Sequence, residues 1–179
     1  MNYKKGTQTR SCMKSVMRYV SQLSKTHWDG QQLVSGIGCQ PETAFDEFLS
    51  TKLLHRKDGG VMFYHMVQSF PKGADIDLRT AHEAARRLAE YFEGCEVLVC
   101  THTDREHIHS HCIINSVNFE TGKKYIWRTN RFRNCAFAMT RFVRNWGCRN
   151  FRKTSSGIRA ECPTQNTTRR TEARVGSSS

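Results

Sequence analysis

One segment, THTDREHIHSHCIINSVN at residues 101–118, constrains the fold more than any other part of this chain. Two stretches of strand-forming residues, 96–103 and 109–117, are separated only by residues 104–108. This spacing is typical of a hairpin loop. The sequence therefore predicts that the two stretches pair as antiparallel strands.

The same segment holds four of the eight histidines, His102, His107, His109 and His111. Side chains at i and i+2 share a face of a strand, so His109 and His111 point the same way, and the hairpin brings His102 beside them. A lone histidine on a strand is usually an ordinary polar residue, but three converging imidazoles favour a metal site that is open to substrate. His107 falls in the loop, and we expect it not to be a ligand.

The remaining elements follow from hydrophobic periodicity and from breaking residues. Helices are expected at residues 11–22, from Pro41 to Leu53, and from an Asp77 cap to a stop at Gly94, with a buried strand at residues 61–70. No repeating parallel crossover is evident. The pattern therefore indicates an α+β fold with a central antiparallel sheet and flanking helices.

The length of 179 residues suits one domain. The sequence contains no apolar run long enough to span a membrane and no secretory leader, so we expect a cytoplasmic protein without membrane insertion. The eight cysteines are dispersed and form no CxxC pair, so we expect reduced thiols rather than disulfides.

The formal net charge of +12 favours an anionic partner, of which a nucleic acid is the usual one. Residues 1–127 carry 16 Lys and Arg against 14 Asp and Glu, and residues 128–179 carry 12 against 2. The basicity therefore belongs to the C-terminal segment. That segment could hold DNA or could be a solvated tail.

Three ordered motifs resemble those of relaxases, the mobilisation nucleases of the HUH endonuclease superfamily. HTD at 102–104 followed by HSHCIIN at 109–115 resembles their third motif. RYV at 18–20 resembles the first, and YH at 64–65 with QSF at 68–70 resembles the second. The likeness is greatest to mobilisation proteins of Gram-positive plasmids and integrative conjugative elements, and it implies an HUH-type sheet with flanking helices.

The resemblance implies a DNA strand transferase that nicks one strand at an origin of transfer. Tyr19 would attack the phosphodiester and form a 5′-phosphotyrosyl intermediate, leaving a 3′-hydroxyl. Asp104 would orient a ligand imidazole, and Ser69 would hold DNA or the tyrosine. Accessory mobilisation proteins are further partners that the family implies.

The resemblance also implies that His102, His109 and His111 hold a divalent metal ion, with Mg²⁺ or Mn²⁺ expected. Zinc or cobalt would also suit three imidazoles. The cation would bind and neutralise the scissile phosphate.

The sequence leaves alternatives open. Rolling-circle replication initiators, also HUH enzymes, place their tyrosine after the histidines, which would make Tyr125 the nucleophile; Tyr3, Tyr64 and Tyr91 are weaker candidates. Another alternative is a non-catalytic DNA-binding remnant. A third is a metal hydrolase that uses water and leaves no covalent adduct.

Beyond Lys124 the resemblance weakens. An apolar stripe with an arginine-rich opposite face predicts a helix over residues 132–146, ended by Gly147. We expect residues 1–150 to form the nuclease domain and residues 151–179 to form a basic, disordered tail rich in Ser and Thr. Relatives usually continue much further, which implies truncation after the nuclease domain; a shifted reading frame is one explanation of the altered tail.

Overall fold

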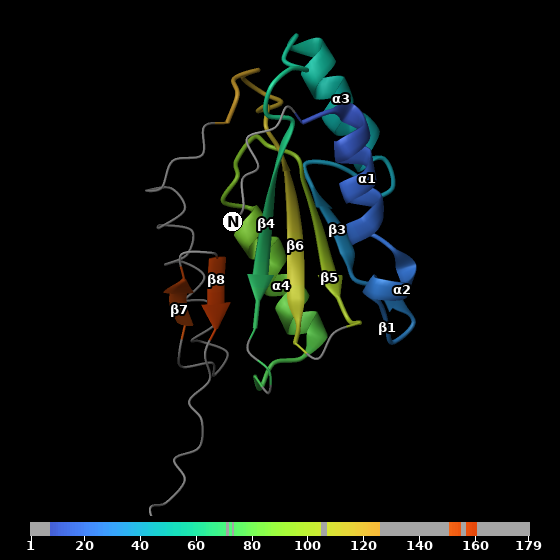
Figure 1. The fold of residues 1–179 in the computed structure, drawn as a ribbon, viewed down its shortest axis with the longest axis vertical. Coiled ribbons are helices and arrows are strands. Elements are labelled where there is room, and N and C mark those ends of the chain that lie inside the picture. Colours follow the sequence, from blue (N-terminus) through green and yellow to red (C-terminus); the bar gives the residue numbers. More distant parts are fainter. Residues whose placement is uncertain are drawn as a thin grey trace, which may run out of the picture.

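The computed structural model describes residues 8–70, 72, 74–104 and 107–125, and the backbone of 151–154 and 157–160. Six of the described strands form a sheet in the order β3-β5-β6-β4-β8-β7 (Figure 1). Their bounds are Val34–Ile37 for β3, Phe63–Ser69 for β4, Val97–His102 for β5, His109–Asn115 for β6, Phe151–Thr154 for β7 and Gly157–Ala160 for β8. Neighbouring strands are antiparallel except β4 and β8, which are parallel.

The hairpin expected from the histidine-rich segment is confirmed. Strands β5 and β6 pair antiparallel, with Val97 opposite Ile114 at one end and His102 opposite His109 at the other. Strand β4 pairs with the other edge of β6, and Ser69 lies opposite His109. One end of the three central strands therefore brings together residues that are far apart in the sequence.

Helices cover both faces of this sheet (Figure 1). Helix α4 (Leu78–Ala89) packs on one face, where its alanines and Leu88 meet Val97, Val99 and Ile114. Helices α1 (Arg10–Val20) and α3 (Ala44–Leu54) lie on the other face and bury Met13, Met17 and Phe48 against strand residues such as Leu98 and Ile113. The fold is therefore α+β, as the sequence predicts.

Helix boundaries differ from the prediction. Helix α1 ends at Val20 rather than at residue 22. Helix α3 begins at Ala44, and residues 41–43 form turns, because the Glu47 carboxylate accepts hydrogen bonds from Thr43 and from the Gln40 amide outside the helix. Helix α4 begins after the Asp77 cap as expected. It ends at Ala89 rather than near Gly94, because residues 90–94 continue as turns that bury Phe92.

The chain between α1 and α3 forms small elements that were not predicted. Helix α2 (Leu23–Thr26) leads into a short hairpin of β1 (His27–Trp28) and β2 (Gln31–Gln32). Its turn is Asp29-Gly30, and both residues have positive φ, at 48° and 72°. An Asp-Gly pair suits such a two-residue turn because both positions need left-handed backbone.

Two short strands are described in the C-terminal segment. Strands β7 and β8 pair with each other, and β8 places Ile158 opposite Gln68 of β4. The helix expected over residues 132–146 and the remainder of the tail lie outside the described residues. Within the described part of the chain, no helix has the length and apolar character needed to cross a membrane.

Candidate active site

Three histidines converge at the end of the β5–β6 hairpin. One ring nitrogen from each of His102, His109 and His111 lies within 4.8 Å of the other two. His102 ends β5, while His109 and His111 sit two residues apart on β6, so strand pairing places all three side chains on one face. The cluster has the donor set and the convergence needed to bind a divalent cation.

Hydrogen bonds to backbone carbonyls show which ring nitrogen carries the proton in two of the three histidines. The Nε2 of His102 donates to the Val20 carbonyl at 2.9 Å, and the Nδ1 of His109 donates to the His107 carbonyl at 3.2 Å. A neutral imidazole has one N–H, so the other nitrogen, Nδ1 of His102 and Nε2 of His109, carries the lone pair. These backbone contacts therefore select the tautomer in which each ring can act as a ligand.

His111 is oriented by a fourth histidine that the sequence analysis did not single out. The Nε2 of His65, on β4, lies 2.8 Å from the Nδ1 of His111. Its position four residues before Ser69 puts both side chains on the face of β4 that the metal cluster occupies. Strand periodicity could have indicated His65, but only the pairing of β4 with β6 shows which ring it contacts.

Burial keeps these rings neutral. It is the main cause that lowers the pKa of His65 and of His109 below the ordinary value of histidine. Burial also lowers the pKa of His111 to about 2, with further lowering by the positive charge of neighbouring groups, Lys25 among them. Neutral rings retain the lone pairs that a cation needs at physiological pH.

Tyr19 stands at the C-terminal end of α1, beside the cluster. Its ring lies 6.3 Å from the ring of His102, edge to face, and the residue is 49% exposed. The next residue, Val20, supplies the carbonyl that holds His102. The end of α1 thus positions a tyrosine and orients a histidine of the cluster at once.

The other described tyrosines lie elsewhere. Tyr125 packs against Phe92 and Tyr64 on the α4 side of the sheet, and its amide bonds to the Ser116 carbonyl beyond the far end of β6. Ser116 is five positions beyond His111 along the chain, a span of about 17 Å in a strand. Tyr64 is buried on the same side, and Tyr91 follows α4. Tyr3 is outside the described residues.

A comparison with protein families agrees with this architecture. The nuclease-domain model of the relaxases, described as MobA/VirD2-like, matches residues 19–148. The chain belongs to this relaxase family. The matched region includes Tyr19, the histidine cluster and all three central strands.

Individual relaxase relatives are also similar. Protein rlx of Staphylococcus aureus is 40% identical over 92 residues, which cover 51% of this chain and 28% of that protein. The group II intron-interrupted relaxase LtrB of Lactococcus lactis subsp. cremoris is 33% identical over 137 residues, covering 62% of this chain and 24% of LtrB. The chain therefore spans about a quarter of the length of these relatives.

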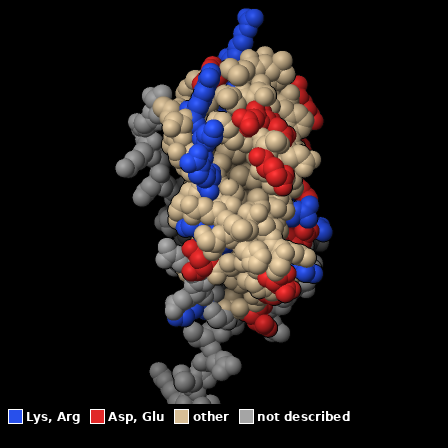
Figure 2. All heavy atoms as spheres, turned by 90° about the vertical axis from the view of Figure 1, so that its right-hand side faces the viewer, with Lys and Arg blue, Asp and Glu red and all other residues tan. Residues whose placement is uncertain are grey.

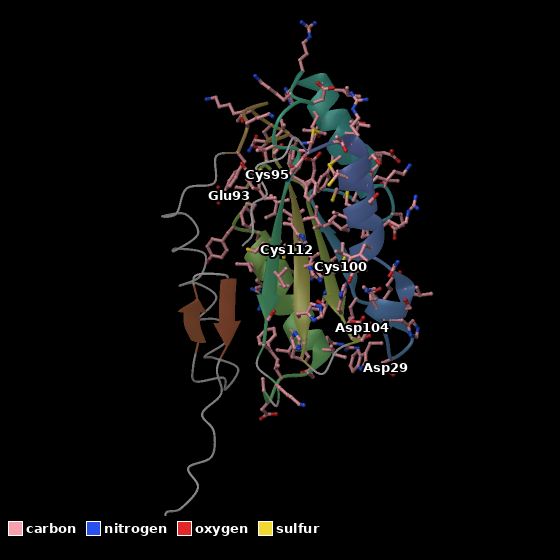
Figure 3. All side chains as sticks on the ribbon, viewed as in Figure 1. Asp29, Glu93, Cys95, Cys100, Asp104 and Cys112 are labelled. Carbon is pink, nitrogen blue, oxygen red and sulfur yellow. The ribbon has the colours of Figure 1, made fainter. Side chains whose placement is uncertain are left out.

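Two further residues expected at the relaxase site lie near the cluster. Asp104, labelled in Figure 3, follows β5 beside α2, and its Oδ1 is 3.9 Å from the Nδ1 of His102, longer than a hydrogen bond. The hydrogen bond that orients His102 is instead made by Val20. Ser69 ends β4 directly opposite His109 and on the same face. Both residues border the metal cluster.

A second polar network lies on the reverse side of the same strands. The His82 ring, from α4, contacts Ser35 and Thr101 at 2.8 Å each, and Thr101 contacts Ser110 at 2.8 Å. Thr101 and Ser110 are cross-strand partners that alternate with the metal-cluster histidines. Burial lowers the pKa of His82 to about 4, so this ring is also neutral.

Proposed function

We propose that this chain is a metal-dependent DNA relaxase that nicks one strand at an origin of transfer. The observation that carries the proposal is the position of Tyr19 beside the cluster of His102, His109 and His111. A phenol needs activation and a positioned phosphate to attack at neutral pH, and this end of the sheet combines a tyrosine with a cation-binding group.

In the proposed reaction, the Tyr19 oxygen forms a bond to phosphorus as the bond from phosphorus to the 3′-oxygen breaks. The phenol releases a proton to solvent and the 3′-oxygen takes one up, so phosphodiester bonds and protons are both conserved. The product is a 5′-phosphotyrosyl link with a free 3′-hydroxyl. Reversal of the same step would rejoin the strand.

A divalent cation, Mg²⁺ or Mn²⁺, would supply a Lewis acid for the non-bridging oxygens of the scissile phosphate. The three imidazoles of the cluster could hold such a cation, because the hydrogen bonds of His102 and His109 to backbone carbonyls leave the other nitrogen of each ring for coordination. Asp104 adds negative charge next to His102, and Ser69 is placed to contact DNA near His109.

The proposed partner is single-stranded DNA at the origin of transfer, together with accessory mobilisation proteins. We propose that the reaction takes place in the cytoplasm. Helix α1 presents three exposed basic side chains at four-residue spacing, Arg10, Lys14 and Arg18. Figure 2 shows a ridge of Lys and Arg along one side of the molecule. Such charges contact phosphates without sequence preference.

We assign the proposed nuclease domain to residues 1–150.

The proposal is tested with single-stranded oligonucleotides that cover the origin of transfer of the element encoding this chain. Protein and Mn²⁺ are added, and a denaturing gel reports covalent protein–DNA adducts. We expect the wild type to form an adduct, and Tyr19→Phe and His109→Ala to lose it. Tyr125→Phe should retain it, because Tyr125 lies at the far end of β6.

Each alternative gives a different result on that gel. Loss of the adduct in Tyr125→Phe but not in Tyr19→Phe would support a replication initiator. Cleavage without an adduct would indicate a hydrolase that uses water. DNA binding in a gel shift without any cleavage would indicate a non-catalytic DNA-binding protein.

A further inference from the structure

Lys25, on helix α2, lies at the proposed nucleophile. Its Nζ is 3.9 Å from the centre of the Tyr19 ring and 3.7 Å from the Oδ2 of Asp104. The Lys25 side chain is 15% exposed, so the ammonium group is largely withdrawn from bulk water.

The ammonium group retains hydrogen-bonding capacity for a substrate. The contact to Asp104 exceeds hydrogen-bond length, and the Tyr19 ring offers only its face. Within the described residues, the Nζ makes no hydrogen bond, although an ammonium group has three donors. An anionic oxygen at this position would take up donors that the protein itself does not use.

The backbone of Lys25 has a separate structural role. Its carbonyl accepts a hydrogen bond from the Thr103 amide at 2.7 Å and is 3.2 Å from the Thr103 hydroxyl. These bonds fix α2 against the end of β5 without using the ammonium group. The side chain can therefore be replaced while α2 stays in place.

We propose that the Lys25 ammonium is a catalytic group that binds a non-bridging oxygen of the scissile phosphate while its contact with the Tyr19 ring holds the phenol toward phosphorus. The inference rests on the proposed relaxase function and adds a residue to it. Lys25 neutralises charge that develops on the phosphate as the Tyr19 oxygen attacks. Preorganised cations in a partly desolvated site stabilise such charge far better than cations in water.

The test compares Lys25→Met with Lys57→Met, which removes an equal charge from an exposed position shortly after α3. Adduct formation is measured in single turnover at saturating DNA and Mn²⁺, so that weaker DNA binding does not affect the rate. We expect Lys25→Met to slow the reaction by about 10²- to 10³-fold, typical for loss of one transition-state donor. Lys57→Met should react at the wild-type rate, and Lys25→Arg, which keeps the charge, should recover most of the loss.

A second substrate separates a phosphate contact from a structural effect. In an oligonucleotide with a methylphosphonate at the scissile position, a methyl group replaces one non-bridging oxygen and the negative charge is absent. The rate ratio of wild type to Lys25→Met should then approach one, whereas misfolding or a displaced tyrosine would slow both substrates equally.

Two results would overturn the inference. One is a Lys25→Met rate equal to that of the wild type. The other is an equal slowing of Lys25→Met on the phosphate and the methylphosphonate substrates. If the methylphosphonate does not react, a Lys25→Arg variant as slow as Lys25→Met has the same meaning. Failure of the proposed function is distinguishable, because the wild type itself would then form no adduct.

Discussion

Each metal-cluster imidazole is oriented by a hydrogen bond to another part of the fold. His102 and His109 each bond to a backbone carbonyl, whereas the Nδ1 of His111 pairs with the Nε2 of the His65 side chain. A backbone carbonyl remains when its side chain is substituted, but the ring that pairs with His111 does not. A substitution of His65 should therefore disturb the geometry of the cluster.

We expect His65→Phe to weaken Mn²⁺ binding by about 10- to 100-fold, the usual effect of losing a partner that orients a metal ligand. Phenylalanine keeps a planar ring on β4 but cannot form a hydrogen bond with the Nδ1 of His111. Isothermal titration with Mn²⁺ measures the change.

His55→Phe is the matched control for that titration, because His55 lies away from the cluster, where its ring contacts the Phe119 carbonyl. Equal Mn²⁺ affinity in His65→Phe and in the wild type would show that the bond between His65 and His111 does not tune the cluster.

At the scale of elements, the β5–β6 hairpin carries two polar layers, one on each face. The histidine cluster occupies one face, and the buried chain from Ser35 through His82 and Thr101 to Ser110 occupies the other. Buried polar groups are costly unless paired, so this chain favours one register of the two strands. A slip by one residue would place Thr101 and Ser110 among the metal ligands.

This buried chain makes stability depend on pH through His82. The pKa of His82 is about 4 in the folded protein, against about 6.5 when unfolded. Between these pH values the unfolded chain binds a proton that the folded protein does not. The contribution of His82 to the free energy of unfolding is therefore fully present above pH 6.5 and is lost as the pH falls toward 4. The contribution of His82 to this fall is at most about 3 kcal/mol.

Urea unfolding at several pH values tests this dependence, with His82→Gln as the variant. Glutamine keeps polar atoms near Ser35 and Thr101 but does not titrate, so the loss of stability between pH 6.5 and 4 should become smaller. A slope unchanged in His82→Gln would assign the effect to the other buried histidines.

The hairpin and its histidines could be predicted because strand alternation and a short loop are local properties. Neighbouring residues 96–117 contain the whole pattern. The start of α3 and the end of α4 were predicted less accurately. Glu47 makes contacts at the start of α3, and Phe92 makes contacts after the end of α4, that hydrophobic periodicity does not reveal. The small elements before α3 carried too few apolar residues to give a signal.

The roles of Lys25 and His65 could not be predicted for a different reason. Each depends on a contact between segments far apart in the sequence, α2 with the end of β5 and β4 with β6. A basic or imidazole side chain has no fixed meaning until its neighbours are known. The position of Tyr19 was predicted from its motif, but its distance from His102 required the packing of α1 on the sheet.

At the scale of the molecule, a buried lysine joins α3 to the end of the sheet away from the cluster. Lys52 is 0% exposed, and its ammonium group bonds to the Asn115 side chain and, at 2.9 Å, to the Ser116 hydroxyl. Asn115 in turn bonds to the Glu96 carboxylate at 2.6 Å. Burial lowers the pKa of Lys52 to about 8. This network anchors the outer helix to the central strands.

We expect Lys52→Met to lower the free energy of unfolding by about 3 to 5 kcal/mol, because it leaves Glu96 and Asn115 buried without their cationic partner. Lys57→Met, an exposed position shortly after α3, should change it by less than about 0.5 kcal/mol. Denaturant unfolding gives both values. A Lys52→Met protein as stable as the Lys57→Met control would mean that the network contributes specificity rather than stability.

The contact between the Val20 carbonyl and His102 has an electrostatic consequence. The peptide dipoles of α1 add up, and its C-terminal end carries a partial negative charge of about half an elementary charge. That end faces a ring of the cluster through Val20, so the field of the helix favours a bound cation. Tyr19 belongs to the same helical turn. A shift of α1 away from the sheet would therefore withdraw the proposed nucleophile and weaken the hold on the cation in one movement.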